Sequence, residues 1–261
     1  MLLATRTRLR GLLGGRLGFC LVCGRRTVFL ISDGSNLREN ARCWHCGSIS
    51  RNRHVAKCVL AALRDPAVAA PRGRGVERLR DLSLRSDLGL YYIGSSGAML
   101  TVWGKQPHIT CSEYFEGGES GEYRDGVLCQ NVERLSFADS SFDLVISEDV
   151  FEHVADYQQG LREVHRVLKP GGHHIFSVPF EFTDQTTSRF ARQGDAYVPT
   201  QPLYTHGDPV RGSIPVFTHF GYDLVEFLRG IGLEASLELS DPKQERRLGT
   251  FGSYTFVTRR V

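Results

Sequence analysis

The sequence predicts an α/β protein in which helices cover both faces of a seven-stranded, mostly parallel sheet, preceded by a small four-cysteine module. Between Leu88 and Phe180, short apolar runs alternate with segments of helical periodicity. Glycine turns or carboxylates follow where those apolar runs end, as they do beside ligand crevices of parallel sheets. Two C-x2-C motifs near the N-terminus predict the module. A chain of 261 residues with 41% hydrophobic residues can bury such a core.

The two cysteine motifs have the spacing of a zinc ribbon. Cys20-Leu-Val-Cys23 and Cys43-Trp-His-Cys46 are separated by 19 residues. Four thiolates would close a tetrahedral shell and leave no position for a reactive water, so the predicted zinc is structural. Two disulfides and a redox dithiol are the alternatives. The absence of a secretion signal disfavours the first, and the duplication of the motif disfavours the second.

The regions around the motifs predict how the module connects to the sheet. A strand is expected over 27–32, followed by a turn at 33–34, and helices are expected over 51–63 and from 76 to about 86. His45 and His54 are expected to be solvated or packed rather than to bind the metal. The predicted domains are a flexible basic N-terminus (1–18), the zinc-ribbon-like module (19–50), a helical connector (51–87) and the sheet domain (88–261), with a lid-like insertion over about 181–220.

Charge is distributed unevenly along the chain. Residues up to Arg85 carry a net charge of +12 and the remainder carries −9. A basic half could contact nucleic acid or an anionic substrate, or it could cover an acidic domain of the same molecule. The first 18 residues contain four arginines and no acid, which is superficially similar to a transit peptide, but an ordinary frayed terminus is favoured. No run is long and apolar enough for a membrane span, so a cytoplasmic protein is expected.

A glycine turn and a carboxylate predict a nucleoside-binding crevice. The apolar run 88–93 ends in Gly94-Ser-Ser-Gly97, which leads into a helix. Glu113 follows the next strand (108–112) and lies 16 positions after Gly97, near the spacing at which a carboxylate binds a ribose diol. A turn of this kind also ends strands for purely structural reasons, and a solvated acid at a strand end is the alternative for Glu113.

Further strands are predicted over 126–129, 142–147 and 173–178. Four polar residues follow the second of these: Glu148, Asp149, Glu152 and His153. They lie where open α/β sheets place their ligand crevices. A helix with apolar residues at 161, 164, 167 and 168 is expected to end at Lys169-Pro-Gly-Gly172, because proline cannot continue it.

These last two segments carry a family resemblance. Phe142-Asp-Leu-Val-Ile-Ser-Glu-Asp-Val-Phe-Glu-His-Val154 and Leu161-Arg-Glu-Val-His-Arg-Val-Leu-Lys-Pro-Gly-Gly172 are similar to class I S-adenosylmethionine (SAM)-dependent methyltransferases, in particular the ubiquinone-biosynthesis-like group. The resemblance is clear over about 88–180. It implies a Rossmann-like fold, completed by a helix over 222–230 and strands near 233–239 and 250–258, and it implies SAM as the cofactor.

The resemblance also implies roles for individual residues. Gly94 and Gly97 would contact the methionine and ribose parts of SAM, and Glu113 the ribose hydroxyls. The chain departs from the family pattern in two places. Tyr92 and Gly94-Ser-Ser-Gly97 stand where an acid and a denser G-x-G-x-G turn are usual. Asn131 stands where an adenine-facing Asp is usual, although an amide can still accept a hydrogen bond. The predicted cofactor-binding residues are Gly94, Ser95, Gly97, Glu113, Tyr114, Asn131, Val132 and Glu148.

Removal of a proton from a hydroxyl acceptor would need a base. His153 is the first candidate, although it could simply pack or cap a helix; Asp149 lies in the same region. His206 is the second, in a proline-rich stretch (197–219) that is expected to be a long loop over the crevice. Tyr204-Thr-His-Gly-Asp-Pro209 loosely resembles a segment of methyltransferases from bacterial glycan and secondary-metabolite clusters.

The predicted function is methyl transfer to a small-molecule or sugar hydroxyl, with the cysteine module helping to form or cover the acceptor site. RNA methylation by the basic half is the rival enzymatic interpretation. The non-enzymatic alternative is a binding or scaffold protein that keeps the fold but does not catalyse a reaction.

Overall fold

The computed structural model describes residues 15–32, 34, 36–64, 77–194, 196–208 and 211–261. The first 14 residues of the predicted basic N-terminus, Asp33 and the predicted loop 71–75 lie outside these ranges. The chain forms two compact units built from non-consecutive segments. The first unit contains Met1–Leu88, Ser96–Ile109 and Leu237–Phe256, and the second contains Gly89–Ser95, Thr110–Ser236 and Val257–Val261. The domain boundaries expected from the sequence stay a prediction.

A three-stranded antiparallel sheet organises the first unit. Strands β1 (Arg16–Cys20), β2 (Arg25–Ile31) and β3 (Ala41–Cys43) pair in that order. Cys20 pairs with Arg25 across the β1–β2 turn, and Gly24 in that turn has φ 70, which glycine adopts without strain. The turn therefore places the first cysteine motif at the end of the sheet. The helices of this unit are α2 (Leu37–Asn40), α3 (Ser50–Ala62), α4 (Ala98–Trp103) and α7 (Pro242–Leu248), with a 3-10 helix over Leu79–Leu84.

The helical predictions for this part of the chain are confirmed for α3 and partly wrong for the next segment. The predicted helix over 76–86 is a shorter 3-10 helix, Leu79–Leu84. Its first two amides, Leu79 N and Arg80 N, donate to Leu21 O and Val22 O in the first cysteine motif. These hydrogen bonds satisfy amides that have no acceptor within the helix and attach its start to the first cysteine motif.

The Rossmann-like fold is built on an eight-stranded sheet, so the predicted count of seven is wrong. Its order is β16-β17-β9-β8-β4-β5-β7-β6. All seven predicted strands are present: β4 (Leu90–Ile93), β5 (Ile109–Glu113), β7 (Val127–Cys129), β8 (Phe142–Glu148), β9 (Leu168–Ser177), β16 (Leu233–Leu239) and β17 (Tyr254–Arg260). The eighth, β6 (Tyr123–Arg124), is an exposed two-residue strand that pairs antiparallel with β7. Its shortness leaves no periodicity to recognise in the sequence.

Parallel pairing in the centre of the sheet brings strand ends together. β4 pairs in parallel with β8, and β8 with β9, over buried apolar residues. β5 pairs in parallel with β7. The last residues of neighbouring parallel strands meet at one edge of the sheet. Glu148 and the Gly94 turn therefore lie at the same edge.

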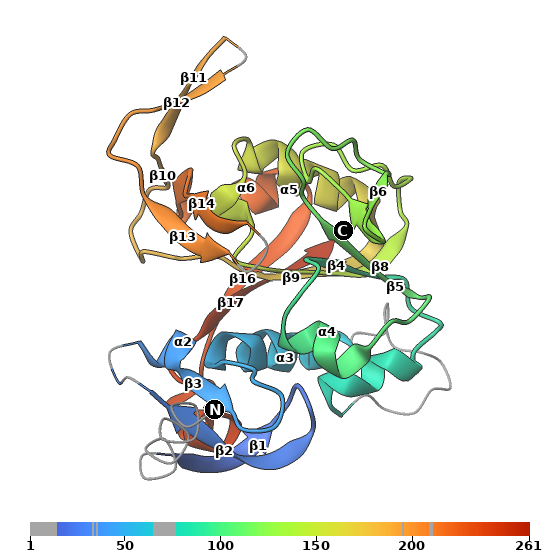
Figure 1. Cartoon of the computed structure of the whole chain (residues 1–261), viewed down its shortest axis with the longest axis vertical. Helices are drawn as coiled ribbons and strands as arrows, with labels where there is room; N and C mark the ends of the chain where they lie inside the picture. Colours follow the sequence, from blue (N-terminus) through green and yellow to red (C-terminus); the bar gives the residue numbers. More distant parts are fainter. Residues whose placement is uncertain (1–14, 33, 35, 65–76, 195, 209–210) are drawn as a thin grey trace. The chain divides into compact units, whose positions relative to one another are not determined.

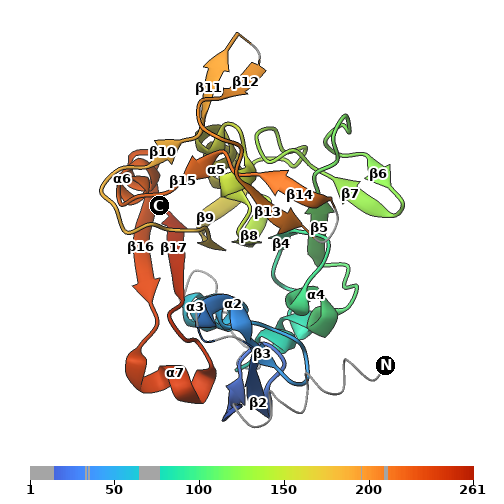
Figure 2. The ribbon, with the colours of Figure 1, turned by 60° about the vertical axis from the view of Figure 1, so that its left-hand side comes forward.

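Two helices of the second unit lie on one side of the β8–β9 part of the sheet, α5 (Tyr157–Val167) and α6 (Asp223–Gly230) (Figures 1 and 2). In α5 the buried side chains Leu161, Val164 and Val167 repeat at helical spacing. The chain turns directly from α5 into β9, which begins at Leu168, five residues earlier than predicted, because Leu168 already pairs with Phe142 across a bulge.

The predicted long loop over the crevice is a set of short hairpins. β11 (Phe190–Gln193) pairs with β12 (Ala196–Pro199), and β13 (Thr205–Asp208) pairs with β14 (Gly212–Pro215). β10 (Thr187–Ser188) and β15 (Thr218–His219) form a third pair. The β11–β12 hairpin projects away from the rest of the second unit in both views (Figures 1 and 2). Among the described helices, every one is too short or too polar to cross a bilayer.

Candidate functional site

The four cysteines predicted to bind zinc form a compact cluster in the first unit. Their sulfur atoms all lie within 4.8 Å of one another. The Cys20 and Cys46 sulfurs are 3.7 Å apart, and those of Cys23 and Cys43 are 3.9 Å apart. Tetrahedral Zn–S bonds of about 2.3 Å place sulfurs about 3.8 Å apart, so the cluster has the dimensions of a four-thiolate site.

Neither nearby histidine joins this cluster, as expected from the sequence. His54 is fully buried, and its Nδ1 lies 2.7 Å from Thr255 Oγ1. Burial lowers the pKa of His54 to about 4, so its ring is neutral at pH 7. His45 is exposed and lines a neighbouring surface pocket.

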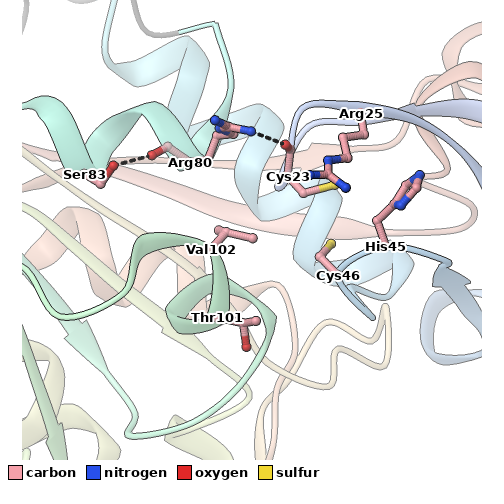
Figure 3. A pocket seen from close by; sticks show the side chains of 8 residues that line it. All are labelled: Cys23, Arg25, His45, Cys46, Arg80, Ser83, Thr101 and Val102. Atoms are coloured by element: carbon pink, nitrogen blue, oxygen red, sulfur yellow. Dashed lines mark hydrogen bonds between the residues drawn. The ribbon is translucent and has the colours of Figure 1, made fainter.

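That pocket has a volume of about 300 Å³ and lies within the first unit (Figure 3). Arg25, Arg80 and His45 give it basic walls, and Cys23 and Cys46 line it as well. Arg80 Nη1 donates to Cys23 O over 3.5 Å. None of the predicted cofactor-binding or catalytic residues lines it, so the pocket is separate from the crevice predicted at the sheet edge.

In the second unit, Glu113 lies at the end of β5 and faces the glycine turn. Ser95 Oγ donates to Glu113 Oε2 over 2.8 Å, and Tyr114 N donates to Glu113 Oε1 over 3.0 Å. Gly94 has φ 157, and a Cβ there would lie 2.8 Å from the Tyr92 ring. The turn therefore needs glycine for close approach of the backbone to its neighbour. Gly97, with φ 113, precedes α4 in the first unit.

The remaining predicted cofactor residues continue along this edge. Tyr92 OH donates to Glu148 Oε2 over 3.1 Å, so the residue that departs from the family pattern is tied to the crevice carboxylate. Asn131 Oδ1 accepts from Glu133 N over 2.9 Å and thereby fixes the turn after β7. Val132 is buried, and its Cγ1 would lie 3.2 Å from a Cβ at Gly160. The Val132 side chain therefore packs against α5. Only the backbone of Val132 could then contact the adenine of a bound cofactor.

The two candidate histidines meet around a buried carboxylate. Glu152 is fully buried in the 3-10 turn Phe151–His153 (η2), and His206 lies on β13. Glu152 Oε1 is 3.5 Å from His153 Nε2 and 3.8 Å from His206 Nδ1. The two imidazole rings are perpendicular, with centroids 5.2 Å apart. We call Glu152, His153 and His206 the carboxylate–histidine cluster.

Hydrogen bonding fixes the orientation of His153. Its Nδ1 lies 2.7 Å from Pro215 O, and since a carbonyl can only accept, Nδ1 carries the proton. Burial lowers the pKa of His153 to about 4, so the neutral ring directs the lone pair of Nε2 toward Glu152. Asp149, with φ 50, accepts from Ser177 Oγ over 2.8 Å, so its carboxylate is attached to the end of β9.

The β13–β14 hairpin connects the carboxylate–histidine cluster with Glu113. His206 is near the start of β13, and Arg211 follows its end. Arg211 Nη2 lies 3.1 Å from Asp208 Oδ2 and 3.5 Å from Glu113 Oε1. The predicted cofactor and base residues of the second unit therefore share one edge of the sheet.

Two residues of this region had no assigned role in the sequence interpretation. The sequence places Glu152 near the crevice without a role. The Glu-His pair that follows a buried strand is the local pattern that could have indicated one. Arg211 gave no signal, because only the pairing of β13 with β14 brings it to Glu113, 98 positions earlier in the chain.

Comparison with known proteins connects this edge of the sheet to methyltransferases. Residues 109–176, from β5 to β9, match the family described as a methyltransferase domain. The chain is 33% identical over 138 residues to dimethylglycine N-methyltransferase of Parasynechococcus marenigrum, covering 46% of this chain and 48% of that protein. It is 30% identical over 119 residues to demethylmenaquinone methyltransferase of Deinococcus radiodurans, with the same coverage. The chain thus spans about half the length of these curated relatives.

Among solved structures, a SAM-bound amino pentose methyltransferase from Micromonospora echinaspora is similar with a TM-score of 0.46 and 14% identity, over 82% of this chain and 93% of that one. The sequence match confirms the predicted methyltransferase domain for residues 109–176.

Proposed function

We propose that this protein is a class I SAM-dependent methyltransferase that methylates a hydroxyl group of a small molecule or sugar. The observation that carries the proposal is the position of Glu113. Glu113 ends β5 inside the segment that matches the methyltransferase domain, and its side chain is 12% exposed. Its carboxylate accepts from Ser95 in the glycine turn, which precedes that segment.

The residues at this edge fit an adenosyl cofactor. A carboxylate with two oxygens suits the two adjacent hydroxyls of a ribose, and Ser95 presents a second polar group beside it. Gly94 lets the backbone approach a bound group without a side chain in the way. Glu148 and the backbone at Val132 would contact the remaining polar groups of SAM. SAM supplies a methyl group that is already activated on a sulfonium sulfur.

The acceptor is proposed to bind between the glycine turn and the carboxylate–histidine cluster. Alignment of the acceptor oxygen is the main requirement of such a reaction, and the β13–β14 hairpin would provide one wall. Glu152 and the two imidazoles would orient the acceptor hydroxyl and assist the loss of its proton. The relatives with named substrates act on amines and quinones as well as sugars, so the hydroxyl acceptor rests on this cluster and not on them.

We also propose that the four-cysteine cluster binds one structural zinc ion. The sulfur separations support a closed four-thiolate shell, and the metal would stabilise the first unit without a part in the chemistry.

Isothermal titration calorimetry with SAM and its demethylated product, S-adenosylhomocysteine, tests the cofactor site. We expect binding by the wild-type chain and at least about tenfold weaker binding by Glu113→Gln, because an amide pairs less well with two hydroxyl donors. Glu122→Gln, an exposed carboxylate of the same unit, is the matched control and should bind like wild type. Absence of binding by the folded wild-type chain would refute the proposal.

A further inference from the structure

The carboxylate–histidine cluster has the composition of a metal site. Two imidazole nitrogens and one carboxylate oxygen are ligands that zinc and its neighbours accept, and three protein ligands leave a position for another oxygen. The three donor atoms lie within 4.8 Å of one another. This cluster is distinct from the four cysteines, which belong to the first unit.

Its dimensions fit one ion. Bonds of about 2.1 Å at tetrahedral angles separate neighbouring donors by about 3.4 Å. Glu152 Oε1 is 3.5 Å from His153 Nε2 and 3.8 Å from His206 Nδ1, so small side-chain rotations complete the geometry. His206 is on a hairpin of the insertion and 30% exposed, which gives it room to make that rotation.

Hydrogen bonds to the backbone hold His153 and Glu152 in place. His153 donates its Nδ1 proton to Pro215 O, and a ligating histidine usually donates its other ring N–H to a carbonyl or carboxylate in this way. Phe217 N donates to Glu152 O over 2.7 Å and holds the η2 turn against the end of the insertion.

Charge gives the ion a physical role. Glu152 is fully buried, and a bound cation would offset the charge of a carboxylate that is held out of water. A divalent cation bound by one carboxylate and two neutral imidazoles leaves a net positive site. Such a site favours an anionic oxygen in its open position.

We propose that Glu152, His153 and His206 bind a zinc-like divalent transition metal whose open position takes the acceptor oxygen. The bound hydroxyl would lose its proton to water and remain as a metal-bound alkoxide, because the ion lowers the pKa of a bound oxygen. The metal site itself stands on the geometry of the cluster, while its part in catalysis rests on the proposed methyltransferase function.

Cobalt(II) titration of the full chain tests the metal site. The purified protein is dialysed against EDTA, its residual zinc is counted by mass spectrometry, and Co²⁺ uptake is then followed by calorimetry and visible absorption. We expect one additional equivalent of Co²⁺ for wild type. Glu152→Gln and His206→Ala should each weaken this uptake at least tenfold. His165→Ala, which changes a histidine of α5 outside the cluster, should leave it unchanged.

X-ray absorption of the cobalt-loaded wild type keeps the test independent of whether the variants fold. A shell of nitrogen and oxygen ligands alone would support the site, whereas sulfur ligands would place the cobalt at the cysteines and overturn it. No uptake by wild type, or uptake retained in both folded cluster variants, would also overturn it. S-adenosylhomocysteine binding, measured without cobalt, fails only if the proposed function fails, so the two proposals are separable.

Discussion

Arg53 is the residue on which the first unit depends most directly. Its side chain is fully buried, and its guanidinium lies 4.2 Å from the centroid of the Phe29 ring. Nη2 donates to Ala41 O over 2.7 Å and Nε to Gly249 O over 2.9 Å; Nη1 donates to Ser48 O. One side chain therefore satisfies carbonyls from β3, from the residues after the second cysteine motif and from the residue after α7.

Replacing Arg53 by Met should strongly destabilise the protein. The variant leaves three buried carbonyls without their donor, and an unsatisfied buried acceptor costs about 1 to 3 kcal/mol. Urea denaturation followed by circular dichroism would measure the loss. Arg42→Met, at an exposed position of β3, should change the free energy of unfolding by less than about 0.5 kcal/mol. Equal stability of the two variants would contradict this account.

At the scale of elements, the N-terminus of α5 is fixed by one side chain. Asp156 is the N-cap residue, and its Oδ1 accepts from Gln159 N over 2.9 Å. Its own backbone N donates to Glu133 Oε1 over 2.7 Å, which ties the start of the helix to the turn after β7. The cap therefore helps to position the segment that contains Asn131 and Val132.

Asp156→Ala should lower the free energy of unfolding by about 1 kcal/mol, because the α5 amide loses its acceptor. Asp156→Asn keeps an acceptor oxygen and should lose less than half of that amount. The comparison is made by chemical denaturation of both variants at one pH. Equal losses in the Asn and Ala variants would show that the charge of Asp156 matters and not its acceptor oxygen.

The three-stranded sheet of the first unit ends at the cysteine cluster, where the proposed zinc site can be tested. If the cysteine cluster binds zinc, the purified chain contains one equivalent of zinc that resists dialysis, and Cys43→Ser loses it together with much of the stability of the first unit. Zinc analysis and a thermal melt measure both effects. Cys111→Ser, outside the cluster, serves as the control and should retain the metal. Full zinc content in the Cys43 variant would contradict the assignment.

At the scale of the whole molecule, buried neutral histidines couple stability to pH in both units. His54 in the first unit has a pKa of about 4, and His174 in the second has a pKa of about 3, both lowered by burial. His174 is fully buried, stacks on Phe176 with centroids 4.4 Å apart, and lies 3.0 Å from Ser147 Oγ through Nε2. In the unfolded chain both rings titrate near 6.5.

Stability should therefore fall as the pH drops below about 6.5. Between 6.5 and the folded pKa values the unfolded state binds more protons, so each histidine removes up to about 1.4 kcal/mol per pH unit. Urea midpoints at pH 7.5, 6.5 and 5.5 would show the loss. His174→Gln, which cannot take up a proton, should reduce the slope; an unchanged slope would rule out His174 as a source.

The sequence by itself determined the features that depend on local chemistry. Apolar runs and glycine turns predicted all seven main strands, because burial between layers requires such runs. The C-x2-C spacing identified four cysteines whose sulfurs do meet, since a short loop fixes where two thiols of one motif can lie. The Glu-His pair after β8 marked the edge of the sheet where the candidate site lies.

Tertiary structure alone decided the contacts between distant segments. His206 meets Glu152 and Arg211 meets Glu113 only because proline-rich segments pair as hairpins, where the sequence predicted a loop. The same holds for Arg53, whose burial depends on carbonyls up to 196 positions away. Backbone carbonyls and strand pairings of this kind leave no local pattern, because any residue can supply a carbonyl. The residue types of the candidate site can therefore be predicted from local sequence, whereas the distances between them depend on the packing of distant segments.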